Sequence, residues 1–213
     1  MNKQLIVGLL VVAACGKKGG SADSVTKADA DAVNALIPAE MKGKLEFEAA
    51  TIEDGMGRHP TKYSVVAPKG WKKGFMPGSL EPADSDNFGS QTMGKTSFKV
   101  GSNCDGSCEK KDWAAVVEKV YYNQFTSGQV TGKVIKDDKR PTGRTLVFQM
   151  EPKTEQQGAG VTMTSGEKKI QIITTWWTDG ATKHYVCQAE LGEPAFGLAA
   201  AFEKACSKVA VDD

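Results

Sequence analysis

Four cysteines beyond residue 100 are the side chains best suited to covalent chemistry. Cys104 and Cys108 form a Cys-x-x-x-Cys motif, which suits a disulfide, a redox-active dithiol or half of a metal site. Thioredoxin-type chemistry uses two intervening residues and a helix N-terminus that lowers the pKa of a thiol. A helix expected after Cys108 meets the second condition alone. A structural disulfide is therefore the better interpretation of this pair.

The other two cysteines lie on elements that must meet. Thr182 to Leu191 alternates as a strand and places Cys187 on its apolar face, while Cys206 lies on the apolar stripe of a helix begun by Pro194. A Cys187–Cys206 disulfide closes a loop of about 20 residues and contributes roughly 3 kcal/mol. If Cys187 pairs with Cys206, then Cys104 and Cys108 are left to form a disulfide with each other. Buried free thiols are the alternative for either pair, although an even cysteine number favours disulfides if the chain is exported.

Metal and cofactor sites find little support. A structural zinc site has four ligands, so a cysteine pair would need two more. The two histidines, His59 and His184, are single residues in unrelated segments. Asp84 to Gly89 begins like a calcium loop, but Phe88 and Lys95 occupy its fifth and twelfth positions, where ligands are needed. We expect a solvated loop there, no bound metal and no cofactor.

The chain also lacks the short motifs of common enzyme classes, including the nucleophile elbow, the phosphate loop, the dinucleotide fingerprint and the zinc-protease helix motif. A hydrolase would have to rely on carboxylates, and the sequence singles out no pair. The net charge of +1, from 27 basic and 26 acidic residues, gives no field suited to nucleic acid. We expect no nucleic-acid partner.

Two adjacent tryptophans, Trp176 and Trp177, must face opposite sides of a strand. If helices cover one face of the sheet alone, one indole stays partly exposed and is available to a ligand or partner. Coverage of that indole by the segment 72–94 is the more common outcome.

Hydrophobic periodicity predicts the elements that position these residues. They are a helix between Thr26 and Pro38, strands at 44–53 and 63–67, a surface loop at 72–94, a strand at 96–101, a helix at 109–125, strands at 132–137, 144–150, 161–165, 168–177 and 182–191, and the helix from Pro194. Strands joined by short turns are antiparallel, and amphipathic helices need a sheet face to cover. The prediction is an α+β fold, an antiparallel sheet flanked by helices in an αβα-type sandwich.

The helix at 109–125 carries the clearest apolar stripe in the chain. Its members are Trp113, Val116, Val117, Val120, Tyr121 and Gln124. The helix that begins at Pro194 carries a second stripe, formed by Leu198, Ala199, Phe202, Cys206 and Val209.

The first 14 residues have the pattern of a secretion signal. Lys3 precedes Leu5 to Ala14, ten residues without a polar side chain, which span about 15 Å as a helix, roughly half of a bilayer's hydrocarbon core. Val12-Ala13-Ala14-Cys15 resembles the bacterial lipobox, in which small residues precede a cysteine that receives lipid. We predict lipidation at Cys15. An ordinary signal cleavage with an incidental cysteine is the alternative.

Residues 15–25 are then expected to form a flexible tether, because no apolar side chain between Gly16 and Ser24 is larger than that of alanine. Such a segment cannot pack against a core. Gly16 stands where many inner-membrane lipoproteins have aspartate, so the outer membrane is the expected location. Residues 26–213 are expected to form a single α+β globular domain.

The order of elements resembles the PsbP-like domains. The resemblance rests on the strand and turn from Tyr63 to Trp71, with its Pro-Lys-Gly-Trp sequence, on the helix at 109–125, on the strands that follow and on the last helix, and it covers about residues 44–209. It implies a small antiparallel sheet flanked by helices. Members include photosystem accessory proteins, transport accessory factors and bacterial lipoproteins, and no family ligand residue can be transferred to this chain.

Together these features predict a lipid-anchored envelope protein with a non-enzymatic binding or accessory domain. We expect it to bind a protein, such as an envelope protein, or another envelope component through a sheet face or the 72–94 loop. The alternative is an envelope enzyme that uses carboxylates or redox chemistry at Cys104 and Cys108.

Overall fold

The computed structural model describes residues 24–55, 60–157 and 161–212. The expected signal segment, Cys15, most of the tether and His59 lie outside the described residues. The helices and helical turns are α1 (Lys27–Asn34), η1 (Ala39–Met41), α2 (Trp113–Val117), η2 (Glu118–Tyr122), α3 (Asn123–Thr126), η4 (Glu193–Leu198) and α4 (Ala199–Cys206). The strands are β1 (Phe47–Glu53), β2 (Lys62–Pro68), β3 (Lys72–Lys73), β4 (Ser79–Glu81), β5 (Ser97–Asn103), β6 (Gly132–Arg140), β7 (Gly143–Met150), β8 (Lys153–Gln157), β9 (Val161–Ser165), β10 (Lys169–Trp176), β11 (His184–Gly192) and β12 (Val209–Asp212).

The strands form two packed sheets and a ribbon. The larger sheet has the order β3-β4-β5-β11-β10-β7-β6, the smaller sheet has the order β1-β2-β12, and β8 and β9 pair with each other. All these pairs are antiparallel. The mixed α+β fold with antiparallel sheets that the sequence predicts is therefore confirmed.

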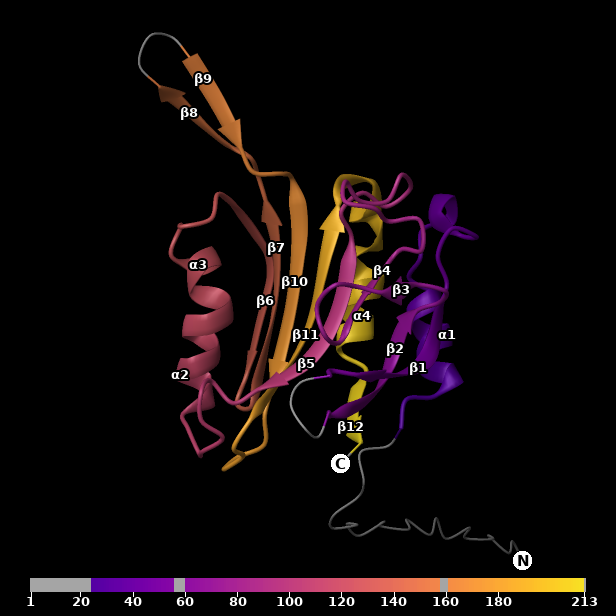
Figure 1. The fold of residues 1–213 in the computed structure, drawn as a ribbon, viewed down its shortest axis with the longest axis vertical. Helices are drawn as coiled ribbons and strands as arrows, with labels where there is room; N and C mark the ends of the chain where they lie inside the picture. Colours follow the sequence, from indigo (N-terminus) through magenta and orange to yellow (C-terminus); the bar gives the residue numbers. More distant parts are fainter. Residues whose placement is uncertain (1–23, 56–59, 158–160, 213) are drawn as a thin grey trace, which may run out of the picture.

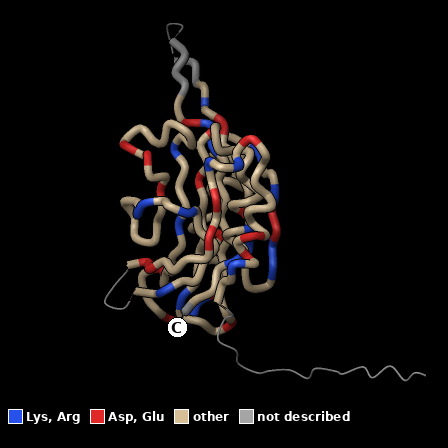
Figure 2. The backbone as a smooth tube through the Cα atoms, turned by 90° about the vertical axis from the view of Figure 1, so that its right-hand side faces the viewer, with Lys and Arg blue, Asp and Glu red and all other residues tan. Residues whose placement is uncertain are grey.

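The helices lie in layers around the larger sheet (Figure 1). The α2–α3 segment covers one face, and α4 packs on the other face, where it also contacts β2 of the small sheet; α1 contacts β1, β2 and α4. The β8–β9 ribbon projects from the larger sheet at the end opposite the C-terminus (Figure 1). Basic and acidic residues are interspersed along the chain rather than gathered in one region of the view in Figure 2.

Local sequence explains how α1 begins. Thr26 accepts a hydrogen bond from the backbone N–H of Asp29, and the Asp29 carboxylate accepts one from the Thr26 N–H, which completes a capping box. The ammonium of Lys208 lies 2.8 Å from Asp29. Hydrogen bonding from Lys208 and Thr26 lowers the pKa of Asp29 below its usual range. Thr26 is thus the N-cap of α1, and the ion pair between Asp29 and Lys208 links this helix to the segment that follows α4.

The predicted helix at 109–125 differs from the observed one in start and in phase. The helix begins at Trp113, and residues 118–122 form a π-helical turn, which adds about one residue to a turn. The added residue shifts the apolar stripe, so Tyr122 and Phe125 are buried while Val120 is 41% exposed and Gln124 faces solvent. The predicted stripe was therefore right for Trp113, Val117 and Tyr121, which packs against buried His184, and wrong for Val120 and Gln124.

Three other segments differ from their predictions. The expected loop at 72–94 contains β3 and β4, which extend the edge of the larger sheet. Val209 begins β12 instead of continuing the last helical stripe, because α4 ends at Cys206. Residues 153–157 form a strand, β8, where the sequence predicted none. Short strands such as these depend on pairing with distant segments, which local periodicity does not reveal.

Candidate functional site

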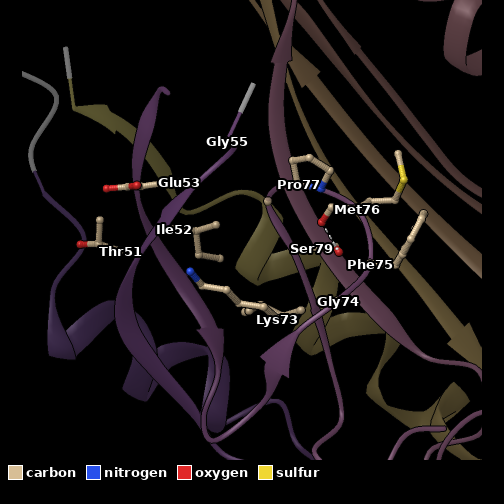
Figure 3. Close-up of a pocket in the computed structure, with 12 residues that line it drawn as sticks. Thr51, Ile52, Glu53, Gly55, Lys73, Gly74, Phe75, Met76, Pro77 and Ser79 are labelled. Atoms are coloured by element: carbon tan, nitrogen blue, oxygen red, sulfur yellow. Dashed lines mark hydrogen bonds between the residues drawn. The ribbon is translucent and has the colours of Figure 1, made fainter. Parts of the chain in front are cut away.

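A cleft of about 650 Å³ lies between β1 and the β3–β4 hairpin. It is lined by residues 51–53, by Gly55 and by residues 73–80 (Figure 3). β1 is the outer strand of the small sheet, and β3 is the outer strand of the larger one. The cleft is thus the place where the free edges of the two sheets lie next to each other.

The backbone of β1 has one paired edge and one open edge. Backbone groups of successive residues in a strand point to alternate sides. Phe47 directs its N–H and C=O away from β2, because both bond to the side-chain amide of Asn34, at 2.7 and 2.9 Å. Ala49, Thr51 and Glu53 have the same parity as Phe47, so their N–H and C=O groups also point to the open edge. Asn34 covers that edge at its start and leaves the part that lines the cleft uncovered.

A buried carboxylate fixes the far end of β1. Asp54 is 1% exposed and accepts hydrogen bonds from the hydroxyl of Tyr63 at 2.9 Å and the hydroxyl of Ser102 at 3.0 Å. The backbone N–H of Thr61 donates to the same carboxylate at 3.1 Å. Burial raises the pKa of Tyr63, so its hydroxyl stays a donor. These bonds join β1 to β2 and β5, and hold the wall of the cleft in one position.

The opposite wall is the tight turn at 74–78. The backbone N–H of Gly74 donates to Ser79, and the backbone N–H of Ser79 donates to Met76, at 2.9 and 3.0 Å. Gly78 has a φ of +72°, and a Cβ there would meet the Val100 carbonyl oxygen at 2.1 Å, so glycine is required.

The turn presents two large apolar side chains to solvent. Phe75 is 95% exposed and Met76 is 51% exposed. Figure 3 shows both on the outer side of the turn, directed away from Ile52. An isolated exposed apolar residue is ordinary, but adjacent aromatic and thioether side chains on a fixed turn are typical of a contact surface.

The charges in the cleft are not balanced. Figure 3 shows Lys73 extending from β3 toward Ile52 of β1. Among the described residues, no carboxylate lies within 4.0 Å of its ammonium group. The nearby carboxylate of Glu53 is 3.5 Å from the ammonium of Lys62. The cleft therefore offers a cation, an open strand edge and an apolar floor at Ile52 and Leu80, a set suited to binding.

Both predicted disulfides are present, at a distance from one another in the fold. Cys187 and Cys206 join β11 to α4, with an S–S distance of 2.00 Å. Both residues are buried in the main core. Cys104 and Cys108 join across a turn that follows β5, with an S–S distance of 2.14 Å. Neither pair lines the cleft.

His184 lies close to the Cys104 turn, because its strand position is opposite Asn103. It is fully buried, its Nε2 is 3.1 Å from the hydroxyl of Tyr121, and Trp113 packs against its ring at 4.9 Å. Its Nδ1 has no hydrogen-bond partner within the described part of the chain. Burial lowers the pKa of His184 to about 4, so the ring is neutral at pH 7.

The two tryptophans face opposite sides of the larger sheet, as predicted. Trp176 packs against the main core and stacks on Tyr185 with ring centroids 5.6 Å apart. Trp177 packs against the cluster under α2–α3. Helices cover both faces, and each indole is half-buried. The structure does not bring either indole to the cleft, and a role for them in ligand binding stays a prediction.

The acidic loop that resembles the start of a calcium site has internal partners. The Asp84 carboxylate accepts a hydrogen bond from the hydroxyl of Ser90 at 2.9 Å, and this bond lowers its pKa. Asp86 accepts one from the backbone N–H of Phe88 at 2.7 Å. Across residues 24–55, 60–157 and 161–212, no three histidine, cysteine or acidic side chains converge as metal ligands.

The cleft itself was missed by the sequence analysis, which treated 72–94 as a loop without internal structure. The signal was present in the Gly-Phe-Met-Pro-Gly run at 74–78, where large apolar residues stand between turn formers. Turn formers force these side chains outward. The position of β1 opposite that turn could not be found from the sequence, because it depends on the packing of two sheets.

A scan against protein-family models and a search of curated proteins both give no match to this chain. In the part of the chain that the structure describes, no helix is long and apolar enough to cross a bilayer.

Proposed function

We propose that this chain is a lipid-anchored protein of the bacterial cell envelope whose globular part binds a partner protein at the cleft between β1 and the β3–β4 hairpin. It acts as a binding or accessory protein and not as an enzyme. Cys15 carries the lipid, residues 16–25 are the tether, and the outer membrane is the expected location.

Several features support this proposal. The Val-Ala-Ala-Cys sequence before the tether fits a lipobox, and two disulfides suit an oxidising compartment outside the cytoplasm. The larger sheet, with helices on both faces, also fits the proposed PsbP-like sandwich. That resemblance brings no catalytic residue with it.

The observation that carries the binding proposal is the exposure of Phe75 and Met76 at the rim of the cleft. The turn that holds them is fixed by hydrogen bonds and by Gly78, so their exposure is built into the fold. Ordered, exposed aromatic side chains lose little conformational entropy on binding, and aromatic residues with methionine are enriched at interfaces.

The test is recovery of a partner from membranes of the native host with the tagged, lipidated chain. We expect Phe75→Ser with Met76→Ser to reduce the recovered partner at least about tenfold, as the loss of a central apolar contact typically does. Phe88→Ser is the matched control, because Phe88 is 87% exposed and does not line the cleft. Equal recovery by the cleft variant and the control would rule out the cleft as the partner site.

The anchor is tested separately. Cys15→Ser should abolish incorporation of radiolabelled palmitate and release the protein from the membrane fraction, while the circular dichroism spectrum of the domain stays unchanged. Persistent labelling of this variant would contradict lipidation at Cys15.

A redox function is the second candidate, and the exposure of the Cys104–Cys108 turn is the observation that favours it. The ammonium of Lys111 donates to the Cys104 carbonyl at 2.9 Å, which places a positive charge beside the pair. Cys104→Ser with Cys108→Ser distinguishes the two functions. A binding protein keeps its partner in this variant, whereas a dithiol oxidoreductase loses the ability to form mixed disulfides.

A further inference from the structure

Building on the proposed function, we infer that the cleft takes an extended acidic segment of the partner protein, which adds as a further strand to the open edge of β1. The segment places an aliphatic side chain on the floor of the cleft and a carboxylate beside Lys73.

The open edge selects an extended backbone. The N–H and C=O groups of Thr51 and Glu53 point away from β2 within the cleft, and an added strand can pair with such a row of donors and acceptors along its length. At Phe47, the Asn34 amide already supplies the two bonds that a neighbouring strand would make. Strand addition continues that pattern along the same edge.

The charge of the cleft selects an acidic segment. Lys73 has no carboxylate within 4.0 Å among the described residues, while Glu53 is already paired with Lys62. An incoming carboxylate therefore gains an ion pair at Lys73, and an incoming ammonium meets repulsion.

The floor of the cleft selects an aliphatic residue. Ile52 is 8% exposed, Leu80 is partly buried, and both pack against the main core. Successive side chains of an added strand point to opposite sides, so a residue that faces this floor alternates with one that faces solvent. The partner segment thus alternates aliphatic and polar residues, with an acidic residue near β3.

The other exposed edge of the larger sheet has features that oppose strand addition. β6 is exposed along its whole length, it carries a bulge between Val134 and Lys136, and six of its nine residues are charged. Bulges and charges are the usual protection of a free edge. β1 has two charged residues among seven, Glu48 and Glu53, and no bulge interrupts its pairing with β2.

The experiment measures binding of synthetic eight-residue peptides to the full chain in detergent by fluorescence anisotropy. Valine and threonine alternate in each peptide, and one central position is glutamate, glutamine or lysine. We expect the glutamate peptide to bind about fivefold more tightly than the glutamine peptide, and the lysine peptide to bind most weakly. Lys73→Glu should remove this preference. Lys72→Glu is the matched control, because Lys72 bonds to Ser85 and does not line the cleft.

The backbone bonds are tested on both partners. Thr51→Pro removes an N–H from the open edge and should weaken binding about tenfold, while Thr51→Ala retains the N–H and should bind normally. The glutamate peptide with alternate amides N-methylated leaves the protein unchanged, and it should lose binding to a similar extent, so the test does not depend on the folding of the proline variant.

Absence of binding by all three peptides, or equal binding by the N-methylated peptide, would overturn strand addition. A preference for lysine would overturn the acidic segment. If the partner is lost with Phe75→Ser and Met76→Ser while the peptides fail to bind, partner binding stands and strand addition is wrong. If the peptides bind as expected while that variant keeps the partner, the cleft accepts strands but is not the partner site.

Discussion

The two faces of the seven-stranded sheet are covered by helices of different character. Under α4 the contacts are almost entirely apolar, and a disulfide joins the helix to the sheet. Under α2–α3 a smaller apolar cluster adjoins buried polar side chains, among them Tyr122, Arg144, Thr175 and His184.

The polar side chains of the second face are joined by directed interactions. The Arg144 side chain is 5% exposed, its guanidinium donates twice to Asp137, at 2.7 and 2.8 Å, and it also pairs with Glu118. The ring of Tyr122 lies 4.4 Å from the guanidinium carbon. The Tyr122 hydroxyl lies 2.9 Å from the Arg144 carbonyl oxygen and 2.8 Å from Thr175.

This difference shows how one sheet can use two ways of holding a helix. Apolar packing tolerates changes of pH and loses stability when volume is removed. A buried polar network depends on geometry and on protonation state. The π-helical turn lets two adjacent residues, Tyr121 and Tyr122, both contact polar groups of the sheet.

The largest expected effect is on the α4 face. Phe202 is fully buried and its ring lies 5.2 Å from Phe47 and 6.2 Å from Phe98. Phe202→Ala should lower the free energy of unfolding by about 3–5 kcal/mol because of lost burial and the cavity left behind. Guanidinium titration of the full chain measures it. Phe88→Ala, on an exposed side chain, should stay within about 0.5 kcal/mol, and a similar loss in both variants would contradict the assignment.

The disulfide of the α4 face should come next. Cys187→Ala with Cys206→Ala should cost about 3 kcal/mol, because the crosslink restricts a long loop in the unfolded chain. Cys104→Ala with Cys108→Ala should cost about 2 kcal/mol, since its loop is much shorter. Denaturation of both double variants gives the comparison, and a larger loss from the short loop would show that loop entropy does not set the order.

The α2–α3 face should carry the pH dependence. The unfolded chain protonates His184 near pH 6.5, whereas in the folded protein the pKa is about 4. The free energy of unfolding is therefore highest above pH 6.5, where His184 is neutral in both states. It falls by up to about 3 kcal/mol as the pH decreases toward 4, because the unfolded chain binds a proton that the folded protein does not. His184→Phe should flatten the pH profile of unfolding in this range. An unchanged slope would show that other groups cause the acid sensitivity.

Removal of the buried Arg144 guanidinium should lower the free energy of unfolding by less than its burial suggests. Arg144→Met should cost about 2 kcal/mol, below the usual cost of breaking a buried ion pair, because Asp137 and Glu118 are partly exposed and can regain water. Hydrogen exchange should then increase in α2–α3 more than in α4. Equal increases at both helices would contradict the separation of the two faces.

The smallest effect is expected from one hydroxyl. Tyr122→Phe removes the hydrogen bonds of the hydroxyl with the Arg144 carbonyl oxygen and the Thr175 hydroxyl, and it keeps the ring. It should therefore lower the free energy of unfolding by about 1 kcal/mol. The same guanidinium titration measures it. A neutral result would show that water replaces the hydroxyl and that the π-helical turn does not depend on it.

Much of the fold could be predicted where the signal was local. The capping box at Thr26 and the antiparallel pairing of consecutive strands such as β10 and β11 follow from side-chain type and periodicity. The Cys187–Cys206 pairing could also be predicted, because a strand face and a helix stripe each have a definite direction. The helix at 109–125 shows where such reasoning ends, since one added residue in a π-helical turn reversed the exposure of Val120 and Tyr122.

The candidate site was less accessible to prediction than the fold. The sequence analysis left the contact surface open between a sheet face and the 72–94 loop, and it did not select Phe75 and Met76 within that loop. The open edge of β1 could not be predicted, because a strand has an open edge only in relation to the strands that pair with it.

By itself the sequence determined the alternation of elements, the two disulfides and the expectation of a lipid anchor at Cys15. These depend on short-range properties: periodicity, spacing and a contiguous motif. Only the tertiary structure decided that β1 and the β3–β4 hairpin lie next to each other as edges of two sheets. It also placed Lys73 between them, without a carboxylate partner among the described residues. The difference in polarity between the two faces of the larger sheet was likewise decided by the tertiary structure. These depend on which distant segments pack together, which is set by the sum of many weak contacts and not by any one stretch of residues.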